Sequence, residues 1–181
     1  MVTVVAWLLV LQGVLGAFDT FVNHEWRERL PHRPWAAREL ALHALRSAHY
    51  TVVFAGIAWL DWHGRWGWVM LGIMSLEYVV TLADSVQEDR TRRLSPVERV
   101  NHMLLALNSG IYMAAFAAQM AWVWLDLPTA LARGSRPWPL VLILSFCAVA
   151  TAVWAVRDAI AWQRMKRLAL LATEPAIQPR G

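Results

Sequence analysis

Five long apolar segments constrain the fold of this chain more than any other feature. They cover residues 2–21, 35–60, 66–86, 97–125 and 137–162. Each is close to the ~20 residues that a helix needs to cross the hydrocarbon core of a bilayer. None shows the period-two alternation of a barrel strand, so all five are predicted to be helices. The charged fraction of 17% agrees, because soluble domains carry about 25%.

The chain is therefore predicted to be an all-α integral membrane protein with five transmembrane helices. Its length suits a single domain, which we place at residues 1–170 and follow with a flexible C-terminal tail at residues 171–181. The single cysteine, Cys147, excludes an internal disulfide.

Basic residues predict the orientation of the chain in the membrane. The connections after the first and third segments, and the stretch after the fifth, are rich in arginine, whereas the other connections carry few basic residues. The positive-inside rule then places the N-terminus outside and the C-terminus in the cytoplasm of a multi-pass protein of the cell membrane. The net charge of +4 is thus a topology signal, and we find no nucleic-acid-binding motif. The residues that carry this bias are Arg27, Arg29, Arg33, Arg38, Arg90, Arg92, Arg93, Arg99, Arg164, Lys166 and Arg167.

Two Glu-x-x-x-His segments begin the second and fourth apolar segments. Glu39 and His43 form the first pair, and Glu98 and His102 form the second. Residues four apart on a helix share a face and differ by ~6 Å in height, so each pair can present both groups to one ligand. The predicted topology brings both pairs to the cytoplasmic side. Ionisable groups inside a membrane bundle are costly and indicate a functional site.

The polar positions also predict an internal repeat of two hairpins. Asp19 to Asn23 aligns with Asp84 to Glu88. Glu39, His43 and His49 then align with Glu98, His102 and Asn108, with the same spacings of four and six. Two such hairpins are expected to be related by a pseudo-twofold axis that passes through the polar site.

Carboxylates and neutral imidazoles suit iron, manganese or zinc. The layout resembles the di-iron and di-manganese carboxylate four-helix bundle proteins, in which two helices give one glutamate each and two give a glutamate–histidine pair. The resemblance covers the first four segments and departs in two respects, because the glutamate–histidine spacing is four rather than three and the single carboxylates are aspartates. The resemblance implies two divalent metal ions, with iron as the preferred candidate and manganese or zinc as alternatives. The predicted ligands are Asp19, Glu39, His43, Asp84, Glu88, Glu98 and His102.

Three further residues are predicted to act beside the ions. Glu77 and His49 are candidates for proton transfer, and Arg46 for orienting ligands or substrate. The apolar surroundings favour an oxidoreductase acting on a lipid-soluble or amphipathic substrate, with membrane lipids and a redox partner as its neighbours. His24 is expected to lie in a loop outside this site.

Two other functions fit parts of the pattern. His43 with His102, or His49 with His102, are candidates to ligate haem b in an electron carrier, but a haem pocket does not need several carboxylates at the same depth. A carrier of protons, metal ions or an anionic solute would also use acidic and histidine side chains. However, the predicted polar groups crowd one side of the membrane, and no polar path continues to the other side.

Overall fold

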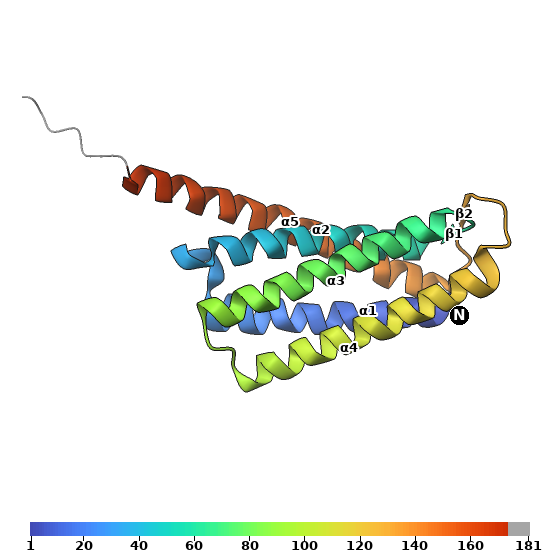
Figure 1. Ribbon diagram of the computed structural model, residues 1–181, viewed down its shortest axis with the longest axis horizontal. Coiled ribbons are helices and arrows are strands. Elements are labelled where there is room, and N and C mark those ends of the chain that lie inside the picture. The colour runs from blue at the N-terminus through green and yellow to red at the C-terminus, as the bar shows by residue number, and fades with distance from the viewer. Residues whose placement is uncertain (174–181) are drawn as a thin grey trace, which may run out of the picture.

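A computed structural model describes residues 1–173, so most of the predicted C-terminal tail lies outside the described residues. The described part is all-α apart from one short ribbon (Figure 1). Its long helices are α1 (Val2–Phe18), α2 (Ala37–Trp59), α3 (Trp66–Thr91), α4 (Pro96–Gln119) and α5 (Trp138–Thr173). π-Helical segments continue α1 and α4, namely η1 (Asp19–Glu28) and η4 (Met120–Trp124). The remaining elements are the 3₁₀ turns η2 (Leu30–His32) and η3 (Pro34–Ala36) and the strands β1 (Leu60–Trp62) and β2 (Leu131–Arg133).

Within the described residues, four helical stretches are long and apolar enough to cross a membrane. They are Val2–His32, Trp66–Thr91, Pro96–Trp124 and Trp138–Leu171. The helix α2 is not among them, because charged and polar residues such as Glu39 and Arg46 lower its hydropathy. The prediction of a helical, membrane-compatible chain is confirmed, and the count of five spans stays a prediction.

Several helices are longer than the apolar segments that predict them. The first helical stretch does not stop at residue 21 but continues through η1, α3 continues to Thr91, and α5 continues to Thr173. The predicted tail, which starts at residue 171, therefore begins inside α5. Hydropathy marks where the apolar surface ends, whereas backbone hydrogen bonds carry a helix on through charged residues beyond the hydrocarbon core.

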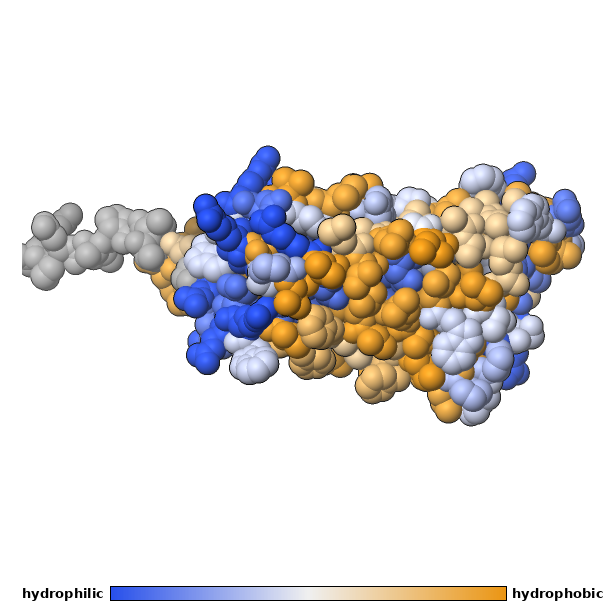
Figure 2. All heavy atoms as spheres, turned by 90° about the horizontal axis from the view of Figure 1, so that it is seen from below, coloured by the Kyte–Doolittle hydropathy of each residue, from blue (hydrophilic) through white to orange (hydrophobic). Residues whose placement is uncertain are grey.

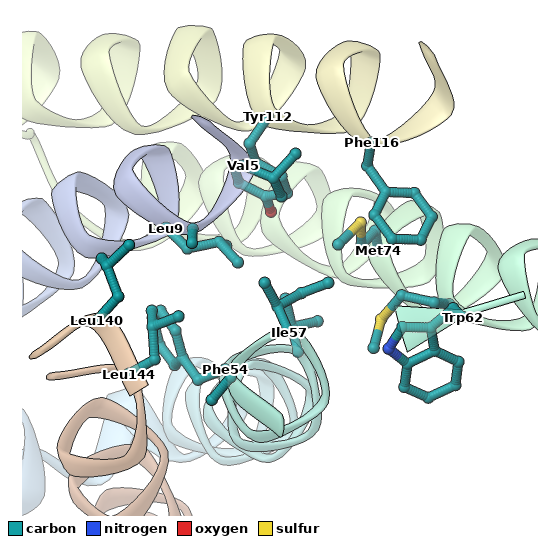
Figure 3. Packing of buried hydrophobic residues seen from close by; sticks show 14 of the residues in the cluster. Val5, Leu9, Phe54, Ile57, Trp62, Met74, Tyr112, Phe116, Leu140 and Leu144 are labelled. Carbon is teal, nitrogen blue, oxygen red and sulfur yellow. The ribbon is translucent and has the colours of Figure 1, made fainter. Parts of the chain in front are cut away.

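The largest apolar core lies in the half of the bundle away from the α3–α4 connection. Leu9 of α1, Phe54 of α2, Phe116 of α4 and Leu144 of α5 are almost completely buried there, with Met74 of α3 beside them (Figure 3). The helix α2 packs against both α3 and α5, and α1 packs chiefly against α4. This core fixes the relative positions of the helices at one end and leaves the other end to polar side chains.

Local signals end and begin the helices near the polar end. Ser95 caps α4, since its hydroxyl accepts a hydrogen bond from the Glu98 N–H at 3.2 Å and Pro96 follows it. Arg29 adopts the left-handed conformation with φ of 51°, which ends η1 immediately before η2. The chain therefore turns sharply from α1 towards α2.

A small ribbon closes the opposite end and was not predicted. Leu60 pairs with Arg133 and Trp62 with Leu131 in an antiparallel register. Arg136 donates a hydrogen bond to Asp61 at 2.6 Å and a second to the Leu60 carbonyl at 2.9 Å. Strands of three residues are too short for a period-two pattern to reveal them.

The surface separates into an apolar band and polar ends. Figure 2 shows hydrophobic residues over the middle of the molecule and hydrophilic residues gathered at the end where α3 stops and α4 begins. Exposed apolar side chains such as Leu107 at 63% and Phe146 at 73% belong to the band. A surface of this kind suits contact with lipid rather than water.

Candidate metal centre

The predicted ligands come together at the polar end of the bundle. They arise from the end of α1, the start of α2, the end of α3 and the start of α4. The carboxylates Asp19, Glu39, Asp84, Glu88 and Glu98 are each at most 1% exposed. Burial of this many carboxylates requires compensating charge or hydrogen bonds, because an unpaired buried charge is very unfavourable.

Two overlapping groups of side chains have ligand atoms close enough together to hold metal ions. The ligand atoms in each group lie within 4.8 Å of one another. One group is Asp19, His24, Glu98 and His102, and the other is His24, Glu39, His43 and Glu88. Histidine and carboxylate donors in sets of four are a donor set typical of iron, manganese or zinc.

His24 belongs to both groups, although its position after the first apolar segment predicts a loop. Its Nε2 lies 3.6 Å from Asp19 Oδ2, 3.6 Å from Glu88 Oε1 and 3.9 Å from Glu98 Oε1. The expectation was wrong because the apolar segment ends near residue 21, whereas the helix continues through η1 to Glu28. In η1 the Arg29 N–H bonds to the His24 carbonyl five residues back, and this wider turn brings residues five apart closer to one face than an α-helix does.

Asp19 and His24 are five residues apart, a spacing that the wider π-helical turn brings together. Asn23 supports the arrangement by donating a hydrogen bond from Nδ2 to Asp19 Oδ1 at 2.8 Å. π-Helical segments are rare and often occur at functional sites. The signal present in the sequence was the proximity of His24 to Asp19, but hydropathy alone places residue 24 beyond the end of the first apolar segment.

Two equivalent histidine–aspartate contacts cross the site. His43 Nε2 lies 3.0 Å from Asp84 Oδ2, and His102 Nε2 lies 3.2 Å from Asp19 Oδ2. The repeat hypothesis aligns His43 with His102 and Asp19 with Asp84, so each histidine contacts the aspartate of the other hairpin. The repeat itself stays a prediction.

Two arginines enter the cluster. Arg46 contacts Asp84 at 3.2 Å and Asp19 at 3.8 Å, which places it between the two aspartates. The guanidinium of Arg92 lies 2.7 Å from Glu98, 3.1 Å from Glu39 and 3.4 Å from Glu88. Burial works to lower the pKa of Arg92, but the hydrogen bond to Glu98 and the charges of Glu39 and Glu88 raise the pKa above its ordinary value.

The charges of these groups do not balance. With all five carboxylates ionised and the histidines neutral, the two guanidinium groups would leave three negative charges uncompensated. Protonation of all three histidines would neutralise them and give a purely structural ion network. However, the rings of His24 and His43 stack with centroids 4.2 Å apart and an interplanar angle of 30°. Two adjacent imidazolium cations repel one another, so this contact disfavours protonation of His24 and His43 at the same time.

Several buried nitrogen and oxygen atoms that could bind a metal ion lack a hydrogen-bond partner among the described residues. They include both ring nitrogens of His24, Oε2 of Glu39, Oε2 of Glu88 and Oδ1 of Asp84. Buried polar atoms are normally paired, so a cluster of unpaired ones indicates a ligand. Neutral imidazole and carboxylate lone pairs together accept a cation, and the residues therefore fit metal ions.

The remaining predicted residues lie at different distances from the cluster. Glu77 lies deeper in the bundle, where Thr81 and Tyr112 donate hydrogen bonds to its two oxygens at 2.7 and 3.3 Å. His49 does not join the cluster, since its Nδ1 lies 2.8 Å from the Leu45 carbonyl of its own helix. Arg46 does join it, through Asp19 and Asp84.

Comparison of the chain with protein-family models, curated proteins and solved structures gives no significant match.

Proposed function

We propose that this chain is a membrane metalloprotein that holds two divalent ions in the cluster at the polar end of its bundle. Iron is the preferred metal. The observation that carries the proposal is the pair of interlocking donor groups that share His24 and contain unpaired, buried ring nitrogens and carboxylate oxygens. Two divalent ions would also offset the three uncompensated negative charges. The resemblance to dinuclear carboxylate bundles rests on this donor chemistry.

Each ion would be held by one donor group. Asp19, Glu98 and His102 would serve the first ion, and Glu39, His43 and Glu88 the second. His24 belongs to both groups and adds a third imidazole. Because one ring nitrogen binds only one ion, His24 Nε2 would serve either ion but not both. Asp84 is absent from both groups and contacts His43 and Arg46, so it would orient His43 as a carboxylate partner rather than bind metal.

Paired ions of this type activate dioxygen or a bridging water. The apolar band around the bundle supports an oxidoreductase whose substrate dissolves in the membrane. In this proposal α2 is a fifth span, because its polar face is covered by the other helices. The protein lies in the cell membrane with the α3–α4 connection in the cytoplasm, and a redox partner would dock there.

The haem alternative fits the geometry less well. Glu88 lies between the two histidines of that proposal, with Oε1 3.9 Å from His43 Nε2 and Oε2 3.3 Å from His102 Nδ1. A porphyrin would have to lie in the same place. An optical spectrum of the purified protein separates the two functions, because a Soret band supports haem and contradicts the dinuclear proposal.

Metal analysis of purified protein tests the proposal directly. Cells are grown with iron, manganese and zinc, and the metal content per chain is measured by mass spectrometry. We expect about two ions per chain, and loss of at least half of them in His24→Ala and in His43→Ala, because each removes a ligand.

The matched control is His49→Ala, which removes a histidine of the same helix that lies outside the cluster. We expect its metal content to equal that of the wild-type protein. Less than one ion per chain in the wild-type protein, or unchanged content in both His24→Ala and His43→Ala, contradicts the proposal.

A further inference from the structure

A cavity of about 350 Å³ lies between α1, α2 and α5, next to the metal centre. Most of its wall is apolar, including Phe54 of α2 and Phe146 and Trp154 of α5. Its volume is near the lower end of the roughly 300–1,000 Å³ typical of small-molecule sites. The space therefore suits one chain-like molecule and is too small for a two-chain phospholipid.

Small residues of α1 create this space. Gly13, Gly16 and Ala17 line one wall. A Cβ added at Gly16 would meet no atom within 4 Å, so nothing in the protein fills the room beside this residue. Glycine inside a helix lowers helix stability by about 1 kcal/mol relative to alanine. Its presence here is consistent with a need for free volume.

One end of the cavity is polar and touches the metal centre. Arg46 lines it and also contacts Asp84 and Asp19, so the same side chain belongs to both sites. Tyr50 and Gln12 line it as well, and Gln12 donates a hydrogen bond to the Tyr50 hydroxyl at 2.7 Å. A guanidinium beside an otherwise apolar wall favours a ligand with an oxygen-bearing head and a hydrocarbon tail.

The other side of the cavity reaches the apolar surface. Phe21 and Phe146 line the cavity and are 55% and 73% exposed. Both lie on the part of the surface that would face lipid in a membrane. A ligand would therefore enter sideways from the bilayer between α1 and α5, without crossing the polar end.

We propose that this cavity binds a single acyl chain with a carboxylate or other carbonyl head, and that Arg46 holds this head beside the metal centre. The proposal rests on the function proposed above and identifies the class of its substrate. The charge balance agrees: two divalent ions and two arginines exceed the five carboxylates by one positive charge, which an anionic head offsets.

Equilibrium binding of tritiated palmitate to the protein in phospholipid nanodiscs tests the proposal. We expect about one palmitate per chain and at least a tenfold weaker affinity in Gly16→Phe and in Ala150→Phe, which fill the cavity from opposite walls. The matched control is Gly72→Phe, because Gly72 lies outside the cavity and a Cβ there also meets no atom within 4 Å. This control is expected to bind palmitate as the wild-type protein does.

The head-group assignment has its own comparison. Arg46→Gln is expected to weaken palmitate binding at least tenfold and to leave the binding of hexadecan-1-ol nearly unchanged, because the alcohol carries no charge. Equal binding of acid and alcohol by the wild-type protein, together with no effect of Arg46→Gln, overturns the role of Arg46.

Metal content measured on the same samples distinguishes the two proposals. A wild-type protein that holds metal but binds no palmitate, or binds it equally well in Gly16→Phe and Ala150→Phe, overturns the cavity proposal and leaves the metal centre intact. A protein that binds palmitate with the expected variant pattern but holds no metal supports the cavity as a lipid site and contradicts the metal proposal.

Discussion

Arg92 joins carboxylates from three helices at the centre of the cluster. Its guanidinium contacts Glu39 of α2, Glu88 of α3 and Glu98 of α4, and its side chain is only 7% exposed. Two of these carboxylates belong to one donor group and the third to the other. Arg92 therefore stabilises the carboxylates when they carry no metal and competes with a cation for the same oxygens.

This competition predicts opposite effects of Arg92→Gln on metal affinity and on stability. We expect Arg92→Gln to bind metal at least about tenfold more tightly than the wild-type protein. The reason is that a nearby unit charge repels a cation by several kcal/mol at an effective dielectric constant of about 20. The metal-free variant should lose about 3 kcal/mol of unfolding free energy, since removing one partner of a buried ion pair leaves the other uncompensated. Chelator titration measures the affinity, and thermal unfolding with excess chelator measures the stability.

Arg93→Gln is the matched control, because Arg93 is the exposed neighbour in the same connection. It should change neither quantity measurably. Weaker metal binding in Arg92→Gln would contradict the competition and show that the arginine helps to assemble the centre.

At the scale of elements, the π-helical segment η1 positions one side of the site. It brings both Asn23 and His24 beside Asp19, whereas a regular α-helix would place residue 23 there and turn residue 24 away. The helix α2 presents Glu39 and His43 at the spacing of four that a regular α-helix allows. In the second hairpin, the aligned residues Asp84 and Glu88 lie four apart on the α-helix α3. The end of the first helical stretch and the end of α3 thus differ in helical period, although the repeat aligns them.

Exchange of two neighbouring side chains in η1 tests this period. The double variant Asn23→His with His24→Asn keeps the composition and moves the imidazole from the position shared by both donor groups to one that contacts Asp19 alone. We expect it to lose at least half of the metal, as His24→Ala does, with an unchanged helical signal in circular dichroism. Full metal content in the double variant would show that the segment readjusts to an α-helical period.

For the whole molecule, the arginine distribution predicts that the two ends of the bundle lie on opposite sides of the membrane. The α3–α4 connection should face the cytoplasm, and the β1–β2 ribbon should face the outside. In a Cys147→Ser background, a membrane-impermeant maleimide should label Asp126→Cys in intact cells. It should label Arg93→Cys only after the membrane is permeabilised.

Both substituted positions are exposed, so accessibility within the protein does not limit either reaction. Labelling of Arg93→Cys in intact cells, with protection of Asp126→Cys, would invert the topology and place the metal centre on the outer side.

The sequence by itself determines the helical class, the apolar band and the set of carboxylates and histidines at one end. Length and hydropathy are enough for these features, because a helix satisfies its own backbone hydrogen bonds and its side chains must match the surrounding solvent. The cap at Ser95 is likewise local, since it depends on residues within one turn.

Only the tertiary structure decides which of these side chains meet. It adds His24 to the site through the π-helical segment and places Arg92 among three glutamates. It leaves His49 outside the site, in contact with a backbone carbonyl of its own helix. It also creates the cavity beside Gly16, because open space depends on how three helices pack. Contacts between distant segments depend on packing angles and helical phase, and neither is encoded in the spacing of residues along one segment.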